Sequence, residues 1–331
     1  MKVEIKKFLV INNEYFQAIS IILCSAWAGY DYCVNKAHYL FNYASVQNGI
    51  PVLLCWNCGR PFIYRILSDI FIRVIMMFGV SLHPAVCTQI IISMCLFGLS
   101  FWYLITTFTS NRWFTFIVAC AVAPAANYIL YHDPYFYAYD ITVLFTFTIG
   151  LALLARSKWK AFLITLFFAS LAKETSIFLV CIFGFYYWNK LSRKQFWKYI
   201  IAQLFIYGFV RLGLMFLFRN NPGPIIASTL KFQLLIYQYW PYAGFLYLFA
   251  FLILLPIWIG WKEKPLFLRE ATIILFPFLI LYMIGGWPLE IRVFGECFPI
   301  IFALFVWPFN TSLSKTIQQN RVIRNQSSLE S

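Results

Sequence analysis

The sequence predicts an all-α, polytopic helical membrane protein with about ten transmembrane helices and an amphipathic surface helix in the first outer loop. Two observations predict this fold class. Of 331 residues, 62% are hydrophobic and only 11% are charged, whereas a soluble domain carries about 25% charged residues. The apolar residues also form long runs, such as 243–261 and 271–287, which approach the ~20 residues needed to cross a hydrocarbon core. An aqueous globular fold is therefore excluded.

The expected spans follow these apolar runs in chain order. They cover residues 10–30, 84–108, 113–131, 136–155, 161–172, 175–188, 199–217, 243–261, 271–287 and 294–309. The first run lacks a small-residue cleavage site, so we expect a retained helix rather than a signal peptide. The spans form a single membrane domain over residues 1–309, and residues 310–331 form a polar cytoplasmic tail that we expect to be disordered.

Basic residues indicate the orientation of the chain. The net charge of +14 would suggest a nucleic-acid partner in a soluble protein. Here most of the 26 Lys and Arg residues lie in short segments on the side that holds both chain ends. By the positive-inside rule, the N-terminus and the C-terminus are cytoplasmic. We therefore expect membrane lipids as partners and no nucleic acid.

The apolar segment 61–80 is predicted to be the surface helix. Arg65, Asp69 and Arg73 are spaced four residues apart and form one charged stripe, as an interfacial helix requires. The opposite face carries Ile63, Ile66, Leu67, Ile70 and Val74. If the segment spanned the membrane, the later loops would exchange sides and most basic residues would face outward.

The segment 161–188 is predicted to be two short helices rather than one. Basic clusters at 156–160 and 190–198 flank it, so both of its ends should be cytoplasmic. A helix of about twelve residues rises only ~18 Å. We therefore expect the tip at Lys173, Glu174 and Thr175 to lie below the membrane surface in a wet cavity.

Asp31 is the first candidate catalytic residue. A charge at membrane depth costs ~2.5 to 3.5 kcal/mol, so an acidic residue beside a span is a candidate for a function that offsets this cost. It directly follows the first expected span and opens an outer loop of about 50 residues, a length that is typical of functional loops. The alternative is a helix-terminal carboxylate exposed to water.

Asp140 is the second catalytic candidate. His132 and Asp133 precede Pro134 at the start of the same expected helix, where Asp133 is placed to cap it. Asp140 lies seven residues after Asp133, on the same face and ~10 Å deeper. It needs a cationic partner, for which Lys173 and Arg292 are the candidates. A functional carboxylate and a structural ion pair are both open.

Glu290, Arg292 and Glu296 surround the start of the last span. The i, i+4 spacing of Arg292 and Glu296 allows them to pair, and an Arg that faces a cavity suits phosphate. Interfacial anchoring is the alternative. We expect a polar cavity open to the outer face, with substrate-binding candidates Arg65, His132, Asp133, Lys173, Glu174, Glu290, Arg292 and Glu296. No metal ligand or cofactor is assigned, and a divalent metal stays open.

Four short motifs carry a resemblance to a known superfamily. They are Pro61 to Leu67, Tyr139-Asp140, Lys173-Glu174-Thr175, and Glu290-Ile291-Arg292 with Glu296 and Pro299. With the long first outer loop, they resemble a group of bacterial multi-span proteins that in turn resemble the GT-C glycosyltransferases. The resemblance implies sugar transfer from a polyprenyl-phosphate carrier at the outer face of the bacterial inner membrane, with Asp31 at the place of the loop-one carboxylate. This chain has Asp31-Tyr32 where that superfamily has paired acidic residues.

Two other function classes use the same residues. A transporter or lipid flippase would use Asp140, Lys173 and Arg292 as a substrate or proton relay. A non-catalytic assembly protein would use the polar residues only to lock helices together. The sequence contains no GxGxxG, P-loop, HxxxH or GxSxG motif, which excludes the commoner soluble enzyme classes.

Overall fold

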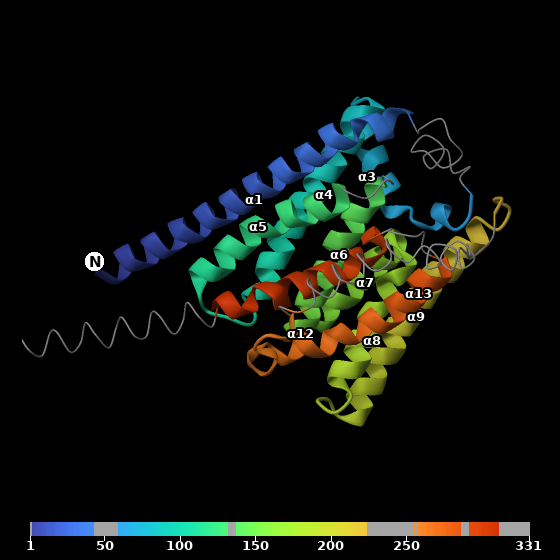
Figure 1. Cartoon of the computed structure of the whole chain (residues 1–331). Coiled ribbons are helices and arrows are strands. Elements are labelled where there is room, and N and C mark those ends of the chain that lie inside the picture. The colour runs from blue at the N-terminus through green and yellow to red at the C-terminus, as the bar shows by residue number, and fades with distance from the viewer. Residues whose placement is uncertain are drawn as a thin grey trace, which may run out of the picture.

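The computed structural model describes residues 2–42, 59–131, 137–223, 255, 257–285 and 291–310. Every regular element in these ranges is helical, which confirms the predicted all-α class. The elements in chain order are α1 (Lys2–Asn42), η2 (Phe62–Tyr64), α3 (Leu67–Met76), α4 (Leu82–Ile105), α5 (Arg112–Tyr131), α6 (Ala138–Ala155), α7 (Trp159–Ala172), η3 (Glu174–Ser176), α8 (Ile177–Tyr187), α9 (Arg193–Leu217), η4 (Trp261–Glu263), α12 (Leu266–Ala271), η5 (Thr272–Ile274), α13 (Leu275–Gly285) and η6 (Ile291–Cys297), followed by a helix over residues 298–310 (Figure 1).

Within the described ranges, six helical stretches are long and apolar enough to cross a membrane. They are Leu82–Ile105, Arg112–Leu130, Ala138–Ala155, Arg193–Leu217, Leu266–Gly285 and Arg292–Asn310. Large apolar side chains also cover the outside of α9, where Phe205, Phe209 and Phe216 are exposed. A helix that is apolar on its exposed face fits lipid rather than water. The chain therefore has the character of an integral membrane protein.

The core lies where α4 and α6 pack together, and α6 is buried over most of its length. α1 lies along one side of the bundle, beside α4 and α5 (Figure 1). The contact between α1 and α4 is close because Gly29 has no side chain. A Cβ at Gly29 would come within 2.9 Å of the Cα of Ile91. Small residues at such contacts let membrane helices approach each other.

α1 is longer than the sequence predicts. We expected the first helix to end near residue 30 and an outer loop to begin at Asp31, but α1 continues to Asn42. Asp31 therefore lies inside a helix and not at the start of a loop. The described part of α1, in which side chains are placed for residues 13–35, is not among the six stretches that are apolar enough to span.

The predicted surface helix exists as η2 and the shorter α3, with Ile63, Ile66 and Leu67 buried as expected, but Asp69, Ile70 and Val74 do not follow the prediction. Asp69 of the charged stripe is buried, with 4% of its surface exposed, whereas Ile70 and Val74 of the apolar face are 38% and 46% exposed. α3 packs against α4 and α6, and Ser68 contributes to a buried hydrogen bond with Thr142. Ser68 and Asp69 therefore face the bundle together with Ile63 and Leu67, whereas Ile70, Arg73 and Val74 are exposed.

The predicted break at Lys173 is confirmed. Lys173 has an extended backbone between α7 and η3. Trp159 at the start of α7 packs against Phe183 and Tyr187 near the end of α8, with ring centroids 5.6 Å and 4.8 Å apart. The two short helices therefore form a hairpin with its tip at residues 173–176. The expected span 243–261 lies mostly, and the tail after residue 310 wholly, outside the described residues.

Candidate functional site

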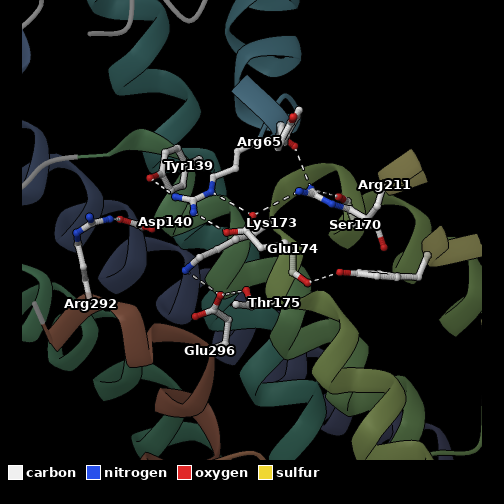
Figure 2. Close-up of polar contacts among 12 residues, drawn as sticks. Arg65, Tyr139, Asp140, Ser170, Lys173, Glu174, Thr175, Arg211, Arg292 and Glu296 are labelled. Atoms are coloured by element: carbon white, nitrogen blue, oxygen red, sulfur yellow. Dashed lines mark hydrogen bonds and ion pairs between the residues drawn. The ribbon is translucent and has the colours of Figure 1, made fainter. Parts of the chain in front are cut away.

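Most candidate residues gather around the tip of the α7–α8 hairpin (Figure 2). Arg292 and Asp140 lie at one side of this cluster, Arg211 lies at the other, and Lys173 and Glu174 lie between them. The extended backbone at Lys173 ends α7, so the side chains of Lys173 and Glu174 point in different directions. Lys173 and Glu174 consequently serve two different ion pairs.

Arg65 and Glu174 form the first of these pairs. Nη2 of Arg65 lies 2.6 Å from Oε1 of Glu174, and Nε donates to Oε2 at 3.3 Å. This two-pronged geometry is the strongest common form of an arginine–carboxylate pair. The Arg65 guanidinium also contacts the hydroxyl of Tyr139. Burial acts to lower the pKa of Arg65, but the Glu174 carboxylate outweighs it and holds that pKa above its usual value.

Arg211 of α9 is a second cation on the same carboxylate. Its Nη2 lies 3.6 Å from Oε2 of Glu174, and its Nη1 donates to the carbonyl oxygens of Tyr64 and Ser170 at 3.2 Å and 3.3 Å. The hydroxyl of Tyr207 donates to the carbonyl oxygen of Glu174 at 2.9 Å. These contacts fasten the hairpin tip to α9 and to the turn before α3. Both oxygens of Glu174 are therefore occupied.

Lys173 and Glu296 form the second ion pair of the tip. Nζ of Lys173 lies 2.9 Å from Oε1 of Glu296, and the hydroxyl of Thr175 donates to the same oxygen. Glu296 is 1% exposed. Its other oxygen, Oε2, has no hydrogen-bond partner within the described part of the chain.

Asp140 and Arg292 form the third ion pair. Nη1 of Arg292 donates to Oδ2 of Asp140 at 2.8 Å, and both side chains are buried. The guanidinium carbon of Arg292 also lies 4.1 Å from the centroid of the Tyr137 ring, a cation–π geometry. Tyr137 in turn stacks on Phe62, with ring centroids 5.7 Å apart. Aromatic rings thus hold the plane of the Arg292 guanidinium.

A cavity of about 150 Å³ joins the second and third pairs. Its polar lining is Asp140, Lys173, Arg292 and Glu296. Apolar side chains from α5, α6 and the last helix complete the wall, including Ile129, Leu144 and Phe298. At 10 to 15 Å³ for each water-sized position, the cavity holds roughly ten such positions. This is the size of a small headgroup rather than of a whole lipid.

The charges of the cluster do not cancel. It contains four cations, Arg65, Lys173, Arg211 and Arg292, and three carboxylates, Asp140, Glu174 and Glu296. Among the described residues the excess is one positive charge, and it comes from Arg65 and Arg211 around Glu174, because the four charged residues that line the cavity balance. An anionic group is therefore the ligand that this cluster attracts.

Asp31 does not belong to the cavity lining. Its two oxygens accept hydrogen bonds from the side-chain amides of Asn35 at 3.0 Å and Asn127 at 2.8 Å. The second bond joins α1 to α5.

Among the predicted site residues, His132, Asp133 and Glu290 lie outside the described residues. Within the described ranges, no group of three or more His, Cys, Asp or Glu residues is placed to hold a metal ion.

Sequence reasoning did not select Arg211 or Thr175 as site residues. Arg211 had a clear signal, because it is a charged residue inside the apolar run 199–217 and such residues need a buried partner. Thr175 had only its position next to Lys173 and Glu174.

Comparison with protein-family models, curated proteins and solved structures finds no match to this chain.

Proposed function

We propose that this chain is a membrane-embedded glycosyltransferase, which moves a sugar from a polyprenyl-phosphate carrier to an acceptor at the non-cytoplasmic face. The proposal includes about ten spans in a bacterial inner membrane, with both termini in the cytoplasm. The observation that carries it is the cavity beside the hairpin tip. Its wall is largely apolar, and its polar lining holds Lys173 and Arg292 together with Asp140 and Glu296, which suits an amphiphile whose headgroup carries both an anionic group and hydroxyl donors.

Arg292 is the residue that we assign to the phosphate. Asp140 and Tyr137 hold its guanidinium in place, and a fixed, planar guanidinium can form two parallel hydrogen bonds to phosphate. Lys173 adds a second cation on the same cavity wall. Cations placed where negative charge develops stabilise a leaving phosphate.

We assign Asp31 to helix packing rather than to proton transfer. Amide donors occupy both of its oxygens and it is not part of the cavity lining. Asp140 lines the cavity but is engaged with Arg292, so we assign it to holding that guanidinium.

The test is carrier binding in lipid nanodiscs. The wild-type chain should bind a polyprenyl phosphate more tightly than the neutral polyprenol of the same length. Arg292→Ala should weaken binding of the phosphate by about 10- to 100-fold, because a hydrogen bond to a charged group contributes ~1.5 to 3 kcal/mol. Arg292→Lys should keep only part of the affinity for the phosphate, since an ammonium group lacks the planar, two-pronged geometry of a guanidinium.

Arg112→Ala is the matched control. Arg112 also pairs with a carboxylate, that of Glu14 at 3.4 Å, but this pair is exposed. Its removal should leave carrier binding unchanged. The proposal would be contradicted if the wild-type chain bound the phosphate and the polyprenol with equal affinity. It would also be contradicted if Arg292→Ala and Arg112→Ala lost the same amount of carrier affinity.

A transporter is the second candidate, and the buried ion pairs are the observation that favours it. Lys173 with Glu296 and Arg292 with Asp140 can exchange partners as a charged substrate or proton passes. Reconstituted vesicles distinguish the two functions. Proton-coupled movement of substrate without any sugar transfer would select the transporter.

A further inference from the structure

Oε2 of Glu296 is a buried carboxylate oxygen without a hydrogen-bond partner in the described chain. Such a group costs ~1 to 3 kcal/mol, or more when charged, and is uncommon in folded proteins. The contrast with Glu174 is direct, because both oxygens of Glu174 meet arginine nitrogens. Glu296 also lines the cavity, so a bound molecule is the partner available to it.

The rest of the Glu296 carboxylate is held firmly. Lys173 and Thr175 both approach Oε1, and in Figure 2 both dashed lines to Glu296 end on this oxygen. Two contacts from the hairpin tip therefore fix the side chain, and the second oxygen is buried without a partner among the described residues. A carboxylate with one oxygen anchored and the other unpaired can accept a proton from a hydroxyl group that reaches the unpaired oxygen.

We propose that Oε2 of Glu296 accepts a hydrogen bond from a substrate hydroxyl and is the general base of the transfer reaction. This inference rests on the glycosyltransferase function proposed above and names the base within the same cavity. The group of the ligand that meets Oε2 must be a hydrogen-bond donor, since the Glu296 carboxylate would repel a phosphate oxygen. The phosphate goes to Arg292 and the hydroxyl of the acceptor goes to Glu296.

The step balances in atoms and electrons. Glu296 Oε2 takes the proton of the acceptor hydroxyl, and the acceptor oxygen forms a bond to the anomeric carbon of the sugar. The bond between that carbon and the phosphate oxygen breaks, and its electron pair leaves with the polyprenyl phosphate. Glu296 is then a neutral acid, which releases its proton to water or to the departing phosphate. No oxidant, reductant or further reactant is required.

Glu296→Gln tests this role because it keeps the shape of the side chain and removes the proton acceptor. The assay uses polyprenyl phosphate glucose as the donor, with water and octyl glucoside as acceptors, and measures donor binding in parallel. The turnover number should fall by ~100-fold or more, while donor affinity stays within about threefold. The rise of turnover with pH that a base produces should disappear.

Two further variants test whether Glu296 acts as a base or only as the counter-ion of Lys173. Glu296→Asp keeps a carboxylate and should recover part of the turnover. Glu270→Gln is the control, because Glu270 also pairs with a lysine, Lys190 at 3.3 Å, but does not line this cavity. It should match the wild type in binding and turnover.

The outcomes distinguish the two proposals. A wild-type chain that neither binds the donor nor releases glucose would overturn the glycosyltransferase function and this inference together. A wild-type chain that transfers glucose, with Glu296→Gln above one tenth of its turnover, would overturn the inference alone. Loss of donor binding in Glu296→Gln would also overturn it, since Glu296 would then be only the counter-ion of Lys173.

Discussion

At the residue scale, the sequence identified which ionisable residues gather and offered two partners for Asp140, of which Arg292 is the one that it meets. The cost of burying a charge brings Asp140, Lys173 and Arg292 together, and the structure joins them at one cavity. The pairing that the i, i+4 spacing allows between Arg292 and Glu296 is not among the ion pairs of the described residues, and both side chains lie in the 3₁₀ helix η6. Such a helix has three residues per turn, so positions four apart leave the common face. Arg292 pairs instead with Asp140.

Asp69 provides a prediction at this scale. Burial raises the pKa of this carboxyl to about 7, and Arg73 opposes the rise only in part. A folded-state pKa above the unfolded value of 3.8 means that the native state binds more protons. The contribution of Asp69 to stability is therefore greatest below pH 4, falls as pH rises towards 7, and is constant above that.

Asp69→Asn should remove this pH dependence. At pH 8 the variant should be more stable than the wild type by roughly 2 to 4 kcal/mol, because each unit of pKa shift is worth ~1.4 kcal/mol. Near pH 4 the two should be equal. Thermal unfolding in detergent across this range measures the difference. A difference that does not change with pH would show that Asp69 is not buried as an acid.

At the element scale, breaks in helices were easier to predict than their orientation. The break at Lys173 follows from charges in the middle of an apolar run and basic clusters at both ends. The orientation of α3 was mispredicted because the rule for interfacial helices assumes water on the charged side. Here Asp69 faces the protein and Val74 faces outward, since α3 packs against other helices.

The packing of α1 on α4 is a prediction at this scale. Gly29→Ala would place a Cβ 2.9 Å from the backbone of Ile91, so the two helices would have to move apart. We expect a loss of about 1 to 3 kcal/mol in stability, as for other overpacked contacts. Thermal unfolding in detergent measures this loss.

Gly213→Ala is the matched control for this change. Gly213 is also helical, but nothing lies within 4 Å of a Cβ placed there. It should be neutral or stabilise by up to about 1 kcal/mol, because Ala favours a helix over Gly. Similar losses in both variants would mean that close packing at Gly29 does not hold α1 in place.

At the scale of the whole molecule, composition alone predicts an all-helical integral membrane protein. The number of spans and their sidedness depend on different physics, because loop charges at the time of insertion set the orientation. Helix packing is the same whichever side faces the cytoplasm. The cavity also needs contacts between distant segments, such as Lys173 with Glu296, which a sequence suggests only through chemical complementarity.

Cysteine labelling tests the orientation. In a background without the native cysteines, a membrane-impermeant reagent applied from outside should modify Asn48→Cys and spare Ser192→Cys. The expectation follows from the basic cluster around Ser192, which the positive-inside rule places in the cytoplasm. Labelling after membrane lysis, which should modify both variants, controls for reactivity. The reverse pattern in intact cells would invert the proposed topology.

An experimental structure of the chain in nanodiscs with polyprenyl phosphate tests the central claim most directly. We predict that the phosphate lies within hydrogen-bond distance of Arg292 and Lys173, with the polyprenyl chain against the apolar wall near Phe298. Lys173 should lie between the phosphate and Glu296, and Oε2 of Glu296 should not contact the phosphate. A lipid bound elsewhere on the bundle, with the Arg292–Asp140 and Lys173–Glu296 pairs intact around an empty cavity, would contradict this assignment.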